Sequence, residues 1–130
     1  MFKRFALLAL PLLASCATAG TPSAQSTTGK WAFVSIDGKA PVSDKAALTI
    51  SADRIGANLG CNGLGGDFKI ENGHLVTGPI ISTMMYCDGL MDQESAVARL
   101  LEAKPAFTIK GDRLIIESGQ HKAELIRAKD

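Results

Sequence analysis

The sequence predicts an all-β fold, either a sandwich or a barrel, that includes a single helix. Three observations point to this class. Short runs of alternating apolar and polar residues recur from Trp31 onward and are separated by turn residues, as in antiparallel sheets. The pair Asn72-Gly73 supplies the two residues with positive φ that a type I′ hairpin turn requires. Helical periodicity occurs in only one segment. The chain has 130 residues, which is enough for one such domain.

The expected strands each present one apolar face. Leu48 and Ile50 lie two residues apart and therefore share one face of their strand. A second hairpin turn is predicted at Gly111-Asp112. One apolar face on each strand indicates one enclosed core. The candidate strands are residues 31–36, 46–51, 54–59, 67–71, 74–77, 80–84, 106–110, 113–117 and 122–127. The aromatic residues expected to pack the core are Trp31, Phe33, Phe68 and Phe107. Tyr86 is expected there with them, with an exposed position as the alternative for this residue alone.

Residues 88–104 are predicted to form the helix, with Asp88 as the N-cap and Pro105 after its end. Its apolar residues at helical spacing are Leu90, Val97, Leu100 and Leu101. Glu94 lies on that apolar stripe, where a carboxylate is costly unless it is hydrogen-bonded. It is either a buried functional acid with a raised pKa or a structural residue that ties the helix to loop amides. The second interpretation is favoured, because structural networks also perturb acids.

Residues 1–15 resemble a removable export signal. Lys3 and Arg4 are followed by an apolar run that is too short to cross a bilayer. Residues 13–16, Leu-Ala-Ser-Cys, resemble the lipobox of bacterial lipoproteins, in which the cysteine is acylated and becomes the first residue of the mature chain. Cys16 would then anchor the protein without a spanning segment. Alternatively, Cys16 only lies beside an ordinary cleavage site. Ala17 in place of Asp resembles the pattern of outer-membrane lipoproteins.

Residues 16–29 contain no bulky apolar side chain and are predicted to be a flexible tether, which places the folded domain at residues 30–130. The remaining cysteines, Cys61 and Cys87, predict a disulfide in an exported domain. It would close a loop of about 27 residues, which stabilises a fold by roughly 3.5 kcal/mol in the chain-entropy model. A zinc site would have to recruit His74 and His121, but neither the cysteines nor the histidines show the close C-x-x-C or H-x-x-x-H spacing of zinc ligands. A reactive thiol is disfavoured in an oxidising compartment.

Several functions find no support in the sequence. Charges of both signs are scattered, whereas a nucleic-acid binder gathers Lys and Arg on one face. The segment 60–67, GCNGLGGD, lacks the Lys-Ser or Lys-Thr of a P-loop and the third small residue of a dinucleotide site. Its glycines are expected to allow a tight strand connection, with Asn62 bonding local backbone amides. No G-x-S-x-G motif is present. We therefore expect no catalytic activity, no cofactor and no metal.

Two motifs resemble those of the META domain (HslJ-like) family. The first comprises Gly60, Cys61, Asn62, Gly66 and Phe68; the second comprises Thr83, Met85, Cys87, Met91 and Glu94. The resemblance spans residues 31–127, and the chain departs from it at residues 63–65, where many members carry a bulkier, more polar loop. It implies a small lipocalin-like antiparallel β-barrel with one α-helix. It also implies a role in envelope stress or antibiotic tolerance and no known reaction.

Three functional hypotheses follow. The first is a monomeric, non-enzymatic lipoprotein, on the periplasmic face of the outer membrane, that binds an envelope protein or a small ligand. The second is an inhibitor of a cell-wall hydrolase or another secreted enzyme, which requires a filled barrel and an exposed, rigid loop. The third is a carrier of a small apolar molecule, which requires a hollow barrel. None of the three involves nucleic acid.

Overall fold

The computed structural model describes residues 26–129, so the predicted leader, Cys16 and most of the predicted tether lie outside the described residues. Nine strands and one helix follow one another within this range. They are β1 Gly29–Ile36, β2 Ala47–Ile50, β3 Arg54–Asn58, β4 Gly63–Glu71, β5 His74–Thr77, β6 Ile81–Ser82, α1 Met91–Glu102, β7 Ala106–Lys110, β8 Arg113–Glu117 and β9 Lys122–Arg127.

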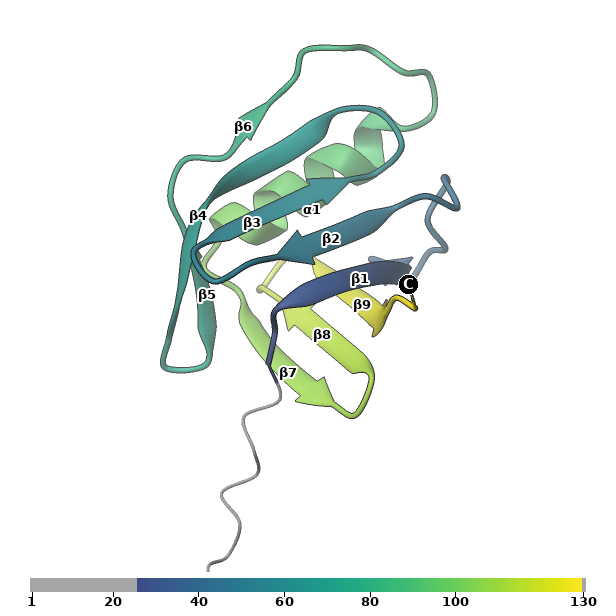
Figure 1. The fold of residues 1–130 in the computed structure, drawn as a ribbon. Coiled ribbons are helices and arrows are strands. Elements are labelled where there is room, and N and C mark those ends of the chain that lie inside the picture. The colour runs from purple at the N-terminus through teal and green to yellow at the C-terminus, as the bar shows by residue number, and fades with distance from the viewer. Residues whose placement is uncertain (1–25, 130) are drawn as a thin grey trace, which may run out of the picture.

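Eight of the strands form a closed antiparallel barrel (Figure 1). They are ordered β3-β2-β1-β9-β8-β7-β5-β4, and β4 pairs back onto β3 to close the ring. The short strand β6 pairs with β4 at Leu64 and Gly65, on the edge that β5 occupies further along. The prediction of a small antiparallel barrel with one helix is therefore confirmed.

The interior of the barrel is filled with side chains. Trp31, Leu75 and Leu125 come from different strands and are fully buried. The apolar face of α1 joins the same core through Val97 and Leu100. Because side chains from the strands and the helix meet in one cluster, helix and barrel share a single core.

Both predicted hairpins are present. Asn72 and Gly73 have φ values of +50° and +77°, as the type I′ turn between β4 and β5 requires. Gly111, with φ of +60°, lies in the turn between β7 and β8. Both turns depend on their own residues and not on distant contacts, which is why the sequence locates them.

The helix begins later than the sequence predicts, and Asp88 is not its cap. The N-cap is Leu90, which makes no side-chain capping bond. Residues 87–90 form a turn in which the Leu90 N–H donates to the Cys87 carbonyl (3.2 Å). Gly89 in this turn has φ of +78°, a conformation that a right-handed helix cannot include. The helix therefore starts only after the turn, at Met91.

The glycine-rich segment 60–67, predicted to be a loop, is mostly strand, because β4 already begins at Gly63. Only Gly60 among its glycines has a positive φ, +106°. Gly66 has a different role: a Cβ there would lie 2.9 Å from the carbonyl oxygen of Pro79. A side chain at this position would therefore collide with the backbone that leads into β6.

The segment before β1 packs against the barrel. The indole N–H of Trp31 donates to the carbonyl of Thr27 (2.8 Å), and Thr27 is buried. The Arg127 guanidinium lies over the Trp31 ring, 4.2 Å from its centre, and donates to the carbonyls of Ser26 and Thr28. Residues 26–28, which precede the predicted domain boundary at residue 30, therefore contact the barrel.

Candidate functional site

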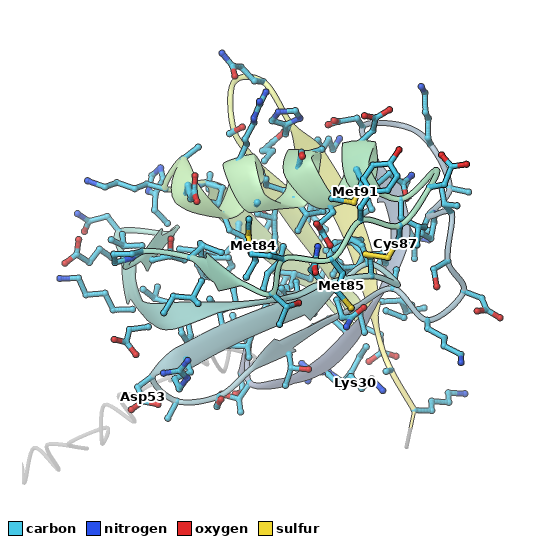
Figure 2. The ribbon with its side chains drawn as sticks, turned by 90° about the horizontal axis from the view of Figure 1, so that it is seen from above. Lys30, Asp53, Met84, Met85, Cys87 and Met91 are labelled. Carbon is cyan, nitrogen blue, oxygen red and sulfur yellow. A yellow bond between two sulfur atoms is a disulfide. The ribbon has the colours of Figure 1, made fainter. Side chains whose placement is uncertain are left out.

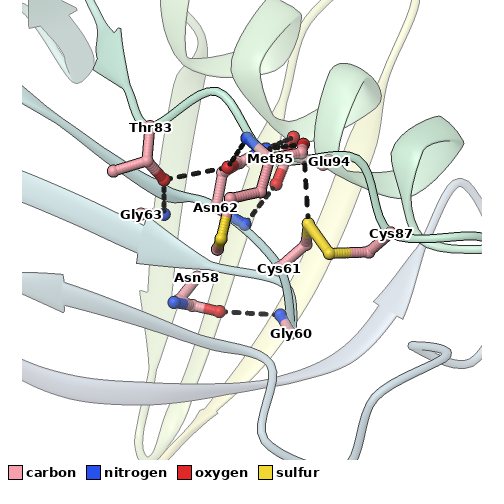
Figure 3. The surroundings of a disulfide bond; sticks show 9 residues. All are labelled: Asn58, Gly60, Cys61, Asn62, Gly63, Thr83, Met85, Cys87 and Glu94. Carbon is pink, nitrogen blue, oxygen red and sulfur yellow. Dashed lines mark hydrogen bonds between the residues drawn. A yellow bond between two sulfur atoms is a disulfide. The ribbon is translucent and has the colours of Figure 1, made fainter.

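The candidate site is the connection between β6 and α1, together with the β3–β4 turn that holds it (Figure 3). Asn62 is the central residue and is almost completely buried. Its Nδ2 donates to the Met85 carbonyl and to Glu94 Oε2, at 2.9 Å each. Its Oδ1 accepts from the Met85 N–H (2.8 Å) and from the Thr83 hydroxyl (2.9 Å). The side-chain amide thus uses both of its protons and both of its lone pairs.

Glu94 joins the same network from the first turn of α1. It is buried, and its Oε1 accepts from the backbone N–H of Asn62 (2.8 Å) while its Oε2 accepts from Asn62 Nδ2. Two hydrogen bonds offset the cost of burying the carboxylate. The predicted tie between Glu94 and loop amides is present. Asn62, however, bonds Met85, 23 residues away, and not the neighbouring amides that the sequence suggests.

A disulfide lies next to this network. Cys61 and Cys87 are bonded, with their Cα atoms 5.9 Å apart, which confirms the predicted bridge. The Cys61 sulfur also lies 3.8 Å from the Met85 carbonyl, a contact without donation because a disulfide sulfur carries no proton. The Thr83 hydroxyl, besides donating to Asn62, accepts from the Gly63 N–H (3.2 Å). The backbone is therefore fixed at Thr83, at Met85 and at Cys87.

Apart from Thr83, whose hydroxyl bonds Asn62, the larger side chains of this fixed segment are exposed. We call residues 81–86 the apolar loop, because four large apolar side chains on it are exposed. The exposed fractions are 74% for Ile81, 94% for Met84, 55% for Met85 and 79% for Tyr86. Figure 2 shows Met84 and Met85 on the strand-to-helix connection, with Cys87 further along it. Tyr86 is exposed, which is the alternative to the core position expected with the other aromatic residues. The sequence places no site at Ile81 or Met84, where the only signal is an apolar run that does not alternate.

The charged residues next to the apolar loop in the sequence are all acidic. No Lys or Arg occurs from Ile70 to Ala98. Asp88 and Asp92 follow the loop and are exposed. An apolar surface with acidic neighbours is complementary to a surface that is apolar in its centre and basic at its rim.

The remaining motif residues shape the backbone around the network. A Cβ on Gly60 would lie 2.6 Å from the Ser43 Cβ, and the Gly60 N–H donates to Asn58 Oδ1 (2.7 Å). Phe68 is buried in the core, and Met91 is half-buried at the start of α1. The two sequence motifs therefore meet in space at one end of the helix.

Gln93, one residue before Glu94, clamps a second loop to the helix. Its Nε2 donates to the Ala40 carbonyl (2.9 Å), and its Oε1 accepts from the Val42 N–H (2.8 Å). The loop between β1 and β2 is thereby fixed against the same helix end as the apolar loop. Two loops that are far apart in the sequence are thus held at the same end of the helix.

Two other polar features lie away from this site. Asp37 accepts from the His121 Nδ1 (2.7 Å) and from the Lys122 backbone N–H (2.9 Å). Burial raises the pKa of Asp37, but these hydrogen bonds outweigh it and lower that pKa below its ordinary value of 3.8.

A surface depression of about 600 Å³ lies between the end of α1 and the β8–β9 turn, lined in part by His74 and Arg99. In residues 26–129 no three His, Cys, Asp or Glu side chains are grouped as metal ligands.

Within the same residues, no helix combines the length and the apolar character needed to cross a membrane. Comparison with curated proteins gives no match. Two structures solved by NMR are similar in fold. One matches with a TM-score of 0.68 and 19% identity over 75% of this chain and 87% of its own. The other, from Burkholderia xenovorans, has a TM-score of 0.63 and 18% identity over 78% of this chain and 83% of its own.

The two solved structures, at 18% and 19% identity, show the fold of this chain, and a family model shows its family. The META domain model matches residues 24–130, which covers the whole barrel, the disulfide and both sequence motifs. The residues on which the resemblance rested therefore lie within the match. This chain belongs to the META domain family.

Proposed function

We propose that this protein is a non-enzymatic binding module of the bacterial envelope that docks another envelope protein through the apolar loop. One observation carries the proposal: four large apolar side chains are exposed on a loop whose backbone is fixed by a disulfide and a buried network. Exposed apolar groups are costly in a monomer unless they serve a contact. A loop that is already rigid loses little conformational entropy on binding, which favours affinity.

The charges favour a protein partner over a lipid surface. Segments that lie in a membrane interface carry Lys and Arg, which meet anionic headgroups. The chain from Ile70 to Ala98 contains neither, and Asp88 and Asp92 would be repelled by such a surface. The complementary partner is a protein with an apolar cleft and basic residues at its rim. Tyr86 and the methionines are residue types that interfaces favour.

The lipobox-like tetrad supports an anchored protein. Acylation of Cys16 would hold the barrel at the membrane, on the periplasmic face of the outer membrane if Ala17 has the meaning that its resemblance implies. Nine residues lie between Cys16 and Ser26, which is the first described residue and contacts the barrel through its carbonyl. The anchor would raise the concentration of the apolar loop near other envelope proteins. A role in envelope stress or antibiotic tolerance, which the family resemblance implies, belongs to this proposal.

Inhibition of a secreted hydrolase is the second candidate. An inhibitor needs a filled scaffold and a rigid, exposed loop that enters a cleft. The buried core and the fixed apolar loop have this combination. The same core gives no support to a carrier of an apolar ligand, because Trp31, Leu75 and Leu125 occupy the space that a ligand would need.

Crosslinking in intact cells tests the docking proposal with the full-length protein. The loop variant is Met84→Gln with Tyr86→Ser, and the matched control is Ile126→Thr, which changes an exposed apolar residue on β9. We expect the wild type and the control to capture the same protein in stoichiometric amount and the loop variant to lose it. Equal capture by the loop variant refutes docking through the apolar loop.

Fractionation tests the anchor independently. Cys16→Ser removes the acylation site that the lipobox resemblance implies. We expect the wild-type protein in the membrane fraction and the variant in the soluble fraction. An unchanged distribution refutes the lipid anchor, but it leaves docking through the apolar loop open to the crosslinking test.

A further inference from the structure

We propose that Met84 and Met85 form a methionine oxidation site, at which a two-electron oxidant such as a hypohalous acid makes the apolar loop polar without unfolding the barrel. The effect on docking rests on the proposed function, whereas the modification itself does not. The inference starts from exposure. Met84 is 94% exposed and Met85 55%, whereas Met91 is half-buried at the start of α1. Oxidation of sulfur side chains follows their access to solvent.

The fold does not depend on these two thioethers. Met85 contributes its backbone N–H and carbonyl to the network, at 2.8 and 2.9 Å from the side chain of Asn62. Neither methionine side chain belongs to the hydrophobic core. Methionine sulfoxide destabilises a protein when the sulfur packs inside a core. Here the added oxygen would face water, while the backbone stays fixed by Asn62 and the disulfide.

The surrounding sulfur chemistry makes these residues the accessible target. Cys61 and Cys87, the cysteines of the described residues, are already joined in a disulfide. An oxidant that approaches this face therefore meets thioethers and no thiol. The residue between Met85 and Cys87 is Tyr86, which shares the exposed surface. The most reactive exposed groups of the loop are thus the two adjacent methionines.

The reaction is balanced with hypochlorous acid as the oxidant. The thioether sulfur gives an electron pair to the oxygen, an S–O bond forms and the O–Cl bond breaks. Chloride and a proton leave to solvent, and the sulfur is oxidised by two electrons. A thiol-dependent sulfoxide reductase reverses the step, because two electrons and two protons restore the thioether and release water. The site can therefore cycle between an apolar and a polar form.

Oxidation removes two of the four apolar side chains of the loop. A methionine that is buried in an interface contributes enough apolar area for roughly a tenfold change in affinity. We therefore expect at least tenfold weaker docking after both methionines are oxidised. The unoxidised loop would bind the protein partner and the oxidised loop would release it. Binding of the partner would therefore depend on whether oxidant is present.

Selectivity is tested first, with the full-length protein and hypochlorous acid in limiting amount. After quenching and digestion, mass spectrometry measures the gain of one oxygen at each methionine. In the native protein we expect Met84 and Met85 to be oxidised at least tenfold faster than Met91. In denaturant the three rates should become similar. A native rate at Met91 equal to that at Met84 overturns the proposal.

The change in surface is tested with a phenyl resin as the apolar probe, alongside the thermal unfolding midpoint. Oxidised wild type should elute earlier than the untreated protein and keep its unfolding midpoint. The matched control, Met84→Leu with Met85→Leu, should keep its elution after the same treatment. Unchanged elution of the oxidised wild type, or a lowered unfolding midpoint, overturns the proposal.

These outcomes are separable from those of the docking test. Selective oxidation and earlier elution, combined with equal capture by the loop variant, would leave the modification site standing without the docking function. Capture that depends on the loop, combined with unselective oxidation, would leave docking standing without the modification site.

Discussion

Replacement of the buried Asn62 by alanine should be among the most damaging single changes at this end of the barrel. The side chain makes four hydrogen bonds, to the Met85 N–H and carbonyl, the Thr83 hydroxyl and Glu94 Oε2. Asn62→Ala removes all four and leaves one carboxylate oxygen of the buried Glu94 without a donor. The connection between β6 and α1 then keeps only the disulfide and the contact between Thr83 and Gly63.

The expected loss follows from these contacts. A hydrogen bond to a charged group contributes about 1.5–3 kcal/mol to stability. The partners on Met85 and Thr83 are exposed enough to be hydrated in part, so each of those bonds contributes about 0.5 kcal/mol. The free energy of unfolding should fall by about 3–4.5 kcal/mol. At about 4–5 °C per kcal/mol for a domain of this size, the unfolding midpoint should fall by roughly 12–22 °C.

Asn58→Ala is the matched control, because Asn58 lies four residues earlier and its side chain makes a single exposed hydrogen bond, to the Gly60 N–H. Urea unfolding followed by circular dichroism gives both free energies with the disulfide intact. We expect Asn58→Ala to cost at most about 1 kcal/mol. A loss for Asn62→Ala no larger than that of the control would refute the view that the Asn62 network fixes the apolar loop.

Three further changes test neighbouring features. Glu94→Gln places an amide NH₂ against one of the two N–H donors of Asn62. Urea unfolding should therefore show that the free energy of unfolding falls by about 1–3 kcal/mol, while capture of the partner stays intact. Lost capture at unchanged stability would instead make Glu94 a functional residue. Gly66→Ala should lower the unfolding midpoint because of the contact with Pro79, whereas Gly63→Ala, which has open space, should not; equal midpoints would contradict the packing argument. The pKa of Asp37 is lower in the folded than in the unfolded state, so the stability that Asp37 contributes is present above its unfolded pKa of about 3.9 and is lost as the pH falls through the folded value. The stability difference between wild type and Asp37→Asn should therefore shrink below about pH 4. A difference that stays constant with pH would contradict this assignment.

The parts of the fold that depend on neighbouring residues can be read from the sequence. The Asn72-Gly73 turn requires only two residues that tolerate positive φ, and its hairpin is where the sequence predicts it. The alternation of Leu48 and Ile50 likewise identifies the buried face of β2 without knowledge of its neighbours. Turn chemistry and side-chain period are local properties, and they are sufficient for an all-β assignment.

Two of the three errors concern contacts between distant segments. Gly63 and Gly66 suggest a loop because glycine is flexible, but they lie in β4, where Gly66 accommodates the backbone of Pro79. Asn62 bonds a loop 23 residues away, a partner that its neighbours in the chain do not indicate. Gly89 is a turn residue whose position just before the helix excludes Asp88 as a cap. Tertiary contacts decide the first two cases, and a local turn decides the third.

The disulfide also determines what happens when a protease cuts the exposed apolar loop. Residues 81–86 lie between Cys61 and Cys87 in the chain. A protease that cuts there divides the polypeptide into two pieces that stay covalently joined, one carrying β1 to β5 and the other the helix and β7 to β9. The cut protein would migrate as one band until a reductant is added. A nick in the exposed segment therefore does not separate the strands of the barrel.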